Sequence, residues 1–224
     1  MKPNHAKPAR GGFTGWDLLI CVVTVVLLAG VLLPALVRPR RGGTHINCVS
    51  SLKQIGLAFR MWANDHGDKF PMQSSALDTN GGTIEFNLTG DVWRHFQVLS
   101  NELSTPKILA CQSDNRTRVT DWGNFTNNSH LSYFVGLDAD ETKPQSILSG
   151  DHNVTTSKVK PVNGVLTLSA GDSLEWTTGM HNKNGNVGLA DGSVAQLTID
   201  NLNKQLQAAV KSTGQSVHRL ALPE

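Results

Sequence analysis

Aromatic residues are scarce in this chain of 224 residues, and a strong net charge is absent. Phenylalanine, tryptophan and tyrosine together make up 6% of the sequence, with a single tyrosine, and the formal net charge is +2. Proteins that bind nucleic acid by stacking combine aromatic side chains with a basic groove. Because no basic segment is interleaved with aromatic residues, we expect no nucleic-acid partner.

Compact patterns for metal binding or catalysis are also missing. There is no Cys-x-x-Cys pair, no Asp-x-Asp-x-Asp loop and no Gly-x-Ser-x-Gly motif. Two sparser sets can be assembled on paper: a calcium or other metal set of His181, Asp172 and Asp191, and a Ser/His/Asp set that uses Ser169 or Ser173. Neither set has the surrounding pattern of its class, so we predict no resident metal, no cofactor and no enzymatic activity.

Charge is unevenly distributed along the chain. Residues 1–41 carry six lysines and arginines against one acidic residue, Asp17, whereas the remaining residues have a net charge of −3. The basic excess flanks residues 18–37, a run of twenty residues without a charge. As a helix, this run spans about 30 Å, the thickness of the hydrocarbon core of a bilayer. The chain has room for one such anchor and one compact domain.

Three interpretations of the apolar run compete: a cleaved secretory signal, a plain signal anchor and a prepilin-type segment. A cleaved signal needs small residues near its end, but this run ends in Ala35-Leu36-Val37. A lipoprotein signal fits poorly because Ile20, which precedes Cys21, is not small. The residues before the run are more informative, since a short basic leader ends in two glycines and is followed by the sequence FTGWD.

This leader, which ends at Gly12 and is followed by Phe13, resembles the N-terminus of type IV prepilins and type II secretion pseudopilins. The resemblance implies a prepilin peptidase that cuts between Gly12 and Phe13 on the cytoplasmic side and methylates the new N-terminus. Asp17 stands where the family has a glutamate, and Pro34 matches the spacing of a proline in the family's helix. The resemblance also implies a single pass of a bacterial inner membrane, with the N-terminus cytoplasmic. The C-terminal domain would then be periplasmic or in an extracytoplasmic fibre, with the helix packed against other pilin-like subunits.

Asp17 and Pro34 each have two explanations. A carboxylate in a membrane helix costs about 3 kcal/mol on insertion and normally has a partner, which the Phe13 amino group of a neighbouring subunit would supply. Alternatively, Asp17 lies at headgroup depth, where a carboxylate favours the start of a helix. Pro34 either follows the family pattern or only kinks the helix near the membrane exit.

After a predicted joint at residues 38–46, residues 47–64 are typical of an amphipathic helix. Apolar side chains recur there at steps of four and three, which predicts a stripe that packs on the sheet of the domain. The stripe consists of Cys48, Leu52, Ile55, Phe59 and Trp62, with Lys53, Gln54 and Arg60 turned outward.

Residues 48–71 resemble the segment that follows the anchor in a large prepilin-like group. The sequence LACQSD around Cys111 resembles the Cys-Pro-Ser-Asp of that group. In an oxidising compartment, Cys48 and Cys111 either form a disulfide or remain two buried thiols, and the resemblance favours the disulfide. This bridge would close a loop of roughly 60 residues and stabilise the fold by about 4 kcal/mol.

The most specific pattern outside the anchor is His181, followed after nine residues by Asp191-Gly192, which resembles a C-terminal motif of the same group. Strand-like segments at 186–190 and 194–197 flank Asp191-Gly192, a strong hairpin signal. We expect His181 to cap this hairpin by bonding near Asp191. Elsewhere, we predict loops, small strands and one short helix at 72–160, a strand at 165–168, a helix at 200–211 and a loose last dozen residues.

The sequence therefore predicts an α+β, pilin-like fold with a long membrane helix, an amphipathic helix and a small antiparallel sheet. Its predicted parts are a leader (1–12), a transmembrane helix (13–37), a joint (38–46) and an extracytoplasmic domain (47–224) with the hairpin motif at 181–192. The expected function is structural, as a subunit of a type IV pilus or a type II secretion pseudopilus-like assembly. The alternative is a membrane-tethered extracytoplasmic binding protein that uses the helix only as an anchor.

Overall fold

The computed structural model describes residues 15–36, 41–77 and 81–224, with the backbone alone for 31–36 and 41–46. The chain divides into two compact units, Met1–Arg40 and Arg41–Glu224. The predicted leader (1–12) lies outside the described residues, and so does the predicted cleavage site between Gly12 and Phe13. Residues 13–14 and 37 of the predicted membrane helix and residues 38–40 of the predicted joint also lie outside them.

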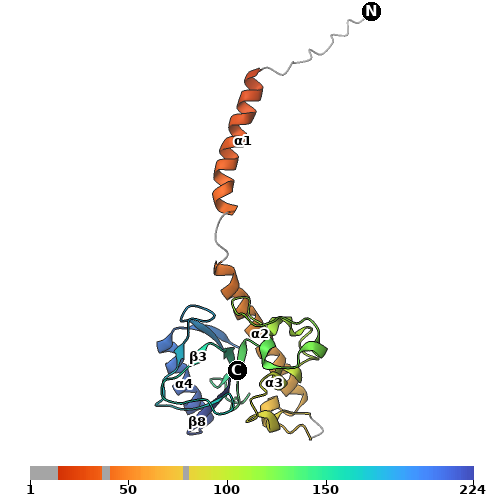
Figure 1. Ribbon diagram of the computed structural model, residues 1–224, viewed down its shortest axis with the longest axis vertical. Helices are drawn as coiled ribbons and strands as arrows, with labels where there is room; N and C mark the ends of the chain where they lie inside the picture. The colour runs from red at the N-terminus through yellow and green to blue at the C-terminus, as the bar shows by residue number, and fades with distance from the viewer. Residues whose placement is uncertain (1–14, 37–40, 78–80) are drawn as a thin grey trace, which may run out of the picture. The chain divides into compact units, whose positions relative to one another are not determined.

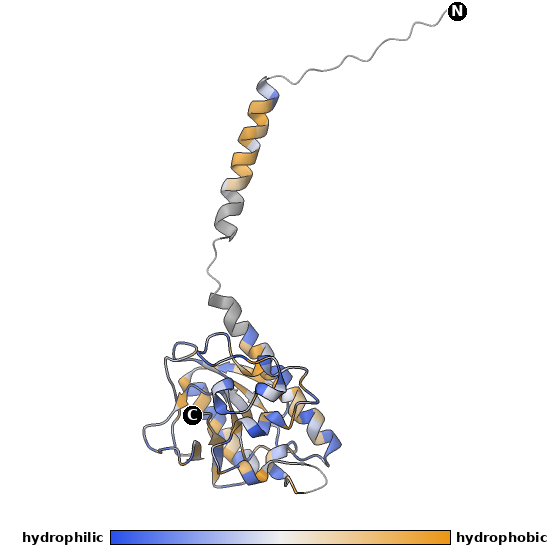
Figure 2. Cartoon of the chain, turned by 45° about the vertical axis from the view of Figure 1, so that its right-hand side comes forward, coloured by the Kyte–Doolittle hydropathy of each residue, from blue (hydrophilic) through white to orange (hydrophobic). Residues whose placement is uncertain are grey.

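The described part of the first unit is the helix α1 (Gly15–Leu36), with Asp17 in its first turn and Pro34 within its length. Between Leu18 and Leu28, every large apolar side chain is 48–66% exposed. These residues follow one another closely in the sequence, so they surround the helix, and Figure 2 shows this part as an almost continuous hydrophobic cylinder. Within the described ranges, we find no helix that combines the length and the apolar character needed to cross a membrane.

The second unit is built on a six-stranded antiparallel sheet with the order β4-β8-β1-β2-β6-β7. The α+β fold with an antiparallel sheet is thus confirmed. A separate two-stranded ribbon pairs β3 with β5. The strands are β1 (Tyr133–Gly136), β2 (Ile147–Asp151), β3 (Val154–Thr155), β4 (Val165–Ser169), β5 (Glu175–Trp176), β6 (Gly185–Leu189), β7 (Val194–Leu197) and β8 (Val217–Ala221).

Two long helices cover the sheet, α2 (Arg41–Asp65) and α4 (Ile199–Thr213), and Figure 1 shows their places in the domain. Side chains alternate between two hydrophobic clusters along β1, because successive strand residues point to opposite faces. Tyr133 and Val135 pack in the cluster of α2, whereas Phe134 packs in that of α4. The sheet therefore separates two cores.

Both predicted helices of this unit are present. The stripe of α2 is confirmed, because all five of its predicted side chains are buried, and Phe59 packs edge-on against Phe70 and Phe96 with ring centroids 6.1 and 5.8 Å apart. The start of α2 differs, since residues 41–46 of the predicted joint are helical. Glycine weakens a helix by roughly 1 kcal/mol without forbidding it, so Gly42 and Gly43 do not end the helix.

Several short helices lie in the segment between α2 and β1, where loops, small strands and one short helix were expected. One is the α-helix α3 (Trp93–Gln97). The others are the 3-10 helices η1 (Pro71–Gln73), η2 (Ile84–Phe86), η3 (Pro106–Leu109), η4 (Trp122–Asn124) and η5 (Asn128–His130).

The prediction of a loose C-terminus is wrong. Residues 217–221 form β8, which pairs with both β4 and β1 inside the sheet. Two polar residues hid the strand pattern. His218 is buried with its Nε2 3.1 Å from the carbonyl oxygen of Ile147, and Arg219 donates from its backbone N and its Nε to the carboxylate of Asp138. Buried polar side chains with such partners are compatible with a core strand.

Replacing Phe59 by alanine tests the packing of α2. We expect Phe59→Ala to lower the free energy of unfolding by about 3–5 kcal/mol, because it leaves a cavity next to the rings of Phe70 and Phe96. Leu57→Ala is the matched control on the same helix, since Leu57 is 58% exposed, and should cost less than about 1 kcal/mol. Urea unfolding measures both, and equal losses in the two variants would contradict the packing described.

Candidate functional site

The disulfide between Cys48 and Cys111 is the centre of the candidate site. It joins α2 to the segment after η3, with the two Cα atoms 5.8 Å apart and a sequence separation of 63 residues. Both cysteines are buried, and the backbone N of Cys111 donates to Ser132 Oγ at 2.9 Å, just before β1. The predicted pairing is confirmed, and the bridge fixes α2 to the end of the sheet.

His181 lies against this disulfide. Its Nε2 is 3.6 Å from Cys111 Sγ and 3.4 Å from Asp151 Oδ2, and the imidazole is fully buried. The sequence placed His181 as the cap of the hairpin near Asp191. In the structure, its described contacts are with the disulfide and with the last residue of β2.

Asp191 and Gly192 form the turn between β6 and β7, as predicted. Asp191 Oδ1 accepts a hydrogen bond from the backbone N of Ser193 at 2.8 Å, and Gly192 has a φ of +84°, which glycine adopts without strain. Arg60 of α2 donates from a guanidinium nitrogen to the Asp191 carbonyl oxygen at 3.0 Å. Both ends of the motif therefore connect to α2. His181 lies against the disulfide that Cys48 of α2 forms, and Asp191 accepts the hydrogen bond from Arg60 of α2.

Asp151 is a buried carboxylate that the sequence did not indicate. Its Oδ2 accepts hydrogen bonds from the backbone N and the side-chain Nδ2 of Asn186 in β6, at 2.7 and 2.8 Å. Its Oδ1 is buried and has no hydrogen-bond partner in the described part of the chain. Burial raises the pKa of Asp151 to about 7, although the hydrogen bonds from Asn186 act in the opposite direction.

Further titratable groups surround Asp151. Tyr133 is its partner across the β1–β2 ladder, and burial together with the charge of Asp151 raises the pKa of the tyrosine hydroxyl. Burial works against ionisation of Asp114, but hydrogen bonds from His152 and Ser132 hold its pKa below the ordinary value. His152 Nε2 is 2.9 Å from Asp114 Oδ2. The site is a polar centre inside an apolar core.

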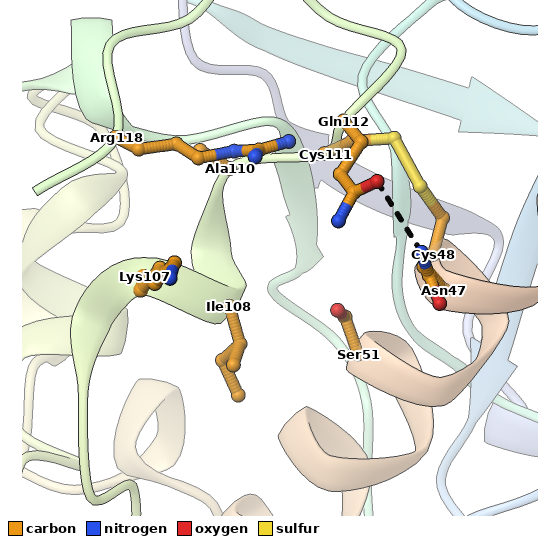
Figure 3. A pocket seen from close by; sticks show the side chains of 9 residues that line it. All are labelled: Asn47, Cys48, Ser51, Lys107, Ile108, Ala110, Cys111, Gln112 and Arg118. Atoms are coloured by element: carbon orange, nitrogen blue, oxygen red, sulfur yellow. Dashed lines mark hydrogen bonds between the residues drawn. A yellow bond between two sulfur atoms is a disulfide. The ribbon is translucent and has the colours of Figure 1, made fainter. Parts of the chain in front are cut away.

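A pocket of about 150 Å³ opens beside the disulfide. Figure 3 shows Lys107 and Arg118 on one side of it and the disulfide with Ser51 on the other. Neither cation takes part in an ion pair among the described residues. The pocket is lined by Asn47, Cys48, Ser51, Lys107, Ile108, Ala110, Cys111, Gln112 and Arg118.

Among the described residues, the predicted metal set of His181, Asp172 and Asp191 is not brought together as one group of possible ligands. Asp172 Oδ2 accepts hydrogen bonds from the backbone N and Oγ of Ser169 at 2.7 and 2.8 Å, so it stabilises the turn after β4. Within the described residues, the group that can hold a metal is Cys48, Cys111 and His181. It contains neither Asp172 nor Asp191.

Comparison of the chain with family models, curated proteins and solved structures gives no match.

The pKa of Asp151 predicts a pH-dependent stability. Between about pH 4 and pH 7, folded Asp151 keeps a proton that the unfolded chain loses, since a solvated aspartate has a pKa of about 3.9. Its contribution is therefore fully present below about pH 4 and is lost as the pH rises to 7, by at most about 1.4 kcal/mol per pH unit. Urea unfolding at several pH values should show the stability of the wild type falling relative to Asp151→Asn over this range.

Asp172→Asn provides the control for this experiment. Asp172 is on the surface, and its hydrogen bonds with Ser169 lower its pKa, so it is already ionised in both states above about pH 4.5. Its difference from the wild type should stay constant from there to pH 7. A constant difference for Asp151→Asn as well would contradict the raised pKa.

Proposed function

We propose that this protein is a structural subunit of a type IV pilus or a type II secretion pseudopilus-like assembly. In this proposal, residues 13–37 anchor the chain in a bacterial inner membrane until a prepilin peptidase removes residues 1–12. The observation that carries the proposal is the exposure of apolar side chains all around residues 18–28 of α1. At about 25 cal/mol per Å² of apolar surface, such a helix gains several kcal/mol when covered, either by lipid or by the same helix of neighbouring subunits.

The leader supports the use of α1 in assembly. Residues 1–12 carry three positive charges, at Lys2, Lys7 and Arg10, which would oppose close packing of apolar helices in a low-dielectric bundle. Cleavage after Gly12 removes them and creates a new amino group at Phe13. That amino group is a partner for the carboxylate of Asp17 on an adjacent helix.

The disulfide supports the extracytoplasmic position of the domain. Structural disulfides form in the periplasm and other oxidising compartments and are rare in the bacterial cytoplasm. A tethered binding protein would have the same anchor and the same disulfide. Cleavage of the leader and the effect of replacing Asp17 are therefore the observations that distinguish an assembly subunit from a tethered binding protein.

Processing is the first of these experiments. The protein recovered from bacterial membranes that contain a prepilin peptidase should begin at methylated Phe13, as measured by intact mass and N-terminal sequencing. Gly12→Leu should remain uncut, because the bulky side chain occupies the position before the scissile bond, whereas Gly11→Ala should be cut. A wild-type chain that retains Met1 would favour the tethered binding protein.

Asp17 separates assembly from anchoring. We expect Asp17→Ala to reduce assembly, measured as cross-linked multimers or sheared fibres, by at least about tenfold, since it removes the charge that pairs with the Phe13 amino group. Asp17→Glu keeps the charge and should assemble. Both variants should remain in the membrane fraction. Normal assembly of Asp17→Ala would show that the helix acts only as a tether.

A further inference from the structure

Three side chains that come from distant parts of the sequence meet beside the pocket. The Sγ atoms of Cys48 and Cys111 and a ring nitrogen of His181 all lie within 4.8 Å of one another, and all three residues are buried. Two thiolates and an imidazole are preferred donors for Zn²⁺, with Zn–S distances of about 2.3 Å and Zn–N distances of about 2.0 Å. Donor atoms around a tetrahedral zinc ion are therefore about 3–4 Å apart. The His181 nitrogen already lies 3.6 Å from Cys111 Sγ, whereas the two sulfurs are bonded to each other and would have to move apart after reduction.

The carboxylate of Asp151 lies beside the His181 ring, outside the group of three residues whose donor atoms are all within 4.8 Å of one another. Its Oδ2 lies 3.4 Å from the same His181 nitrogen, and its buried Oδ1 lacks a hydrogen-bond partner among the residues described. The two hydrogen bonds from Asn186 hold this carboxylate in place, as outer-shell partners commonly do at metal sites. A cation would also offset the cost of a carboxylate in an apolar core.

We propose that reduction of the Cys48–Cys111 disulfide converts this cluster into a zinc site, with Cys48, Cys111 and His181 as ligands and Asp151 as the fourth donor. Reduction by a dithiol breaks the S–S bond, adds two electrons and two protons, and oxidises the dithiol to its own disulfide. Binding of Zn²⁺ then releases the two thiol protons. The expectation of no metal site rested on the absence of a Cys-x-x-Cys spacing. The fold nevertheless brings two cysteines and a histidine that are distant in the sequence close together.

The pocket gives reductant and metal a route to the cluster, because both cysteines line its wall. Lys107 and Arg118 lie on the opposite side of the pocket (Figure 3), and their positive charges favour the entry of anionic thiols and anionic metal complexes over that of a free cation. In the reduced state, the metal would replace the covalent link between α2 and the segment after η3. The same two cysteines would therefore connect α2 to the segment after η3 either by a disulfide or through a shared zinc ion.

Cobalt binding tests the proposal directly. The full chain is reduced with a phosphine, freed of reductant without oxygen, and titrated with Co²⁺. We expect one equivalent to bind, with a thiolate-to-cobalt charge-transfer band and ligand-field bands typical of four-coordination, and Zn²⁺ to displace it. The oxidised protein should show none of these bands, and equal binding by the oxidised form would overturn the proposal.

Variants separate the cluster from other donors. Cys48→Ser and His181→Ala should abolish the four-coordinate spectrum, and Asp151→Asn should weaken binding by about 10–100-fold. Cys21→Ser is the matched cysteine control, because Cys21 is the remaining, exposed cysteine, and His130→Ala is the histidine control. Both should bind as the wild type does. Loss of binding in the controls, or its persistence in Cys48→Ser, would overturn the assignment.

Thermal unfolding provides a readout that does not depend on the spectrum. Zn²⁺ at about 100 times its Kd should raise the Tm of the reduced wild type by roughly 5–10 °C and leave the oxidised wild type unchanged. If the reduced chain unfolds without metal, Zn²⁺ should restore its circular dichroism. A reduced chain that neither gains stability nor refolds with Zn²⁺ contradicts the proposal.

Discussion

The attachment of α2 to the sheet is the constraint on which the rest of the domain depends. The helix buries one apolar stripe, and it is held at two points twelve residues, or about 18 Å, apart. At Cys48 the link is the disulfide, with His181 packed against it, and at Arg60 it is a hydrogen bond to Asp191. The segment from His181 to Asp191 therefore aligns the β6–β7 hairpin with the helix.

This attachment explains why a polar group lies in the core. Asp151 ends β2 where the disulfide, the imidazole of His181 and the amide of Asn186 converge. An apolar residue at this position could not accept the two hydrogen bonds from Asn186. The backbone N–H and the side-chain amide of Asn186 would then lack these partners, which costs about 1–3 kcal/mol for each buried group. The carboxylate thus fixes the register of β6 against β2 at the expense of a raised pKa.

Periodicity in the sequence was sufficient for much of the fold. The stripe of α2, the strand at 165–169, the hairpin turn at Asp191-Gly192 and the helix α4 all follow from local patterns. Local patterns did not predict the strand β8. His218 and Arg219 are polar, and their partners, Ile147 and Asp138, are distant in the sequence. The sequence also showed no sign of the polar centre at the candidate site. Asp151 and Asn186 become neighbours only through the pairing of β2 with β6, which local patterns do not reveal.

The position of β8 has a consequence for biosynthesis. It follows every other strand in the sequence, yet it lies between β4 and β1. Until β8 has emerged, β4 has no partner in the sheet and β1 exposes an open edge, so the sheet cannot close during synthesis of the earlier residues. Open strand edges pair readily with other chains. The nascent domain therefore keeps two strand edges open to pairing with other chains until its last strand has been made.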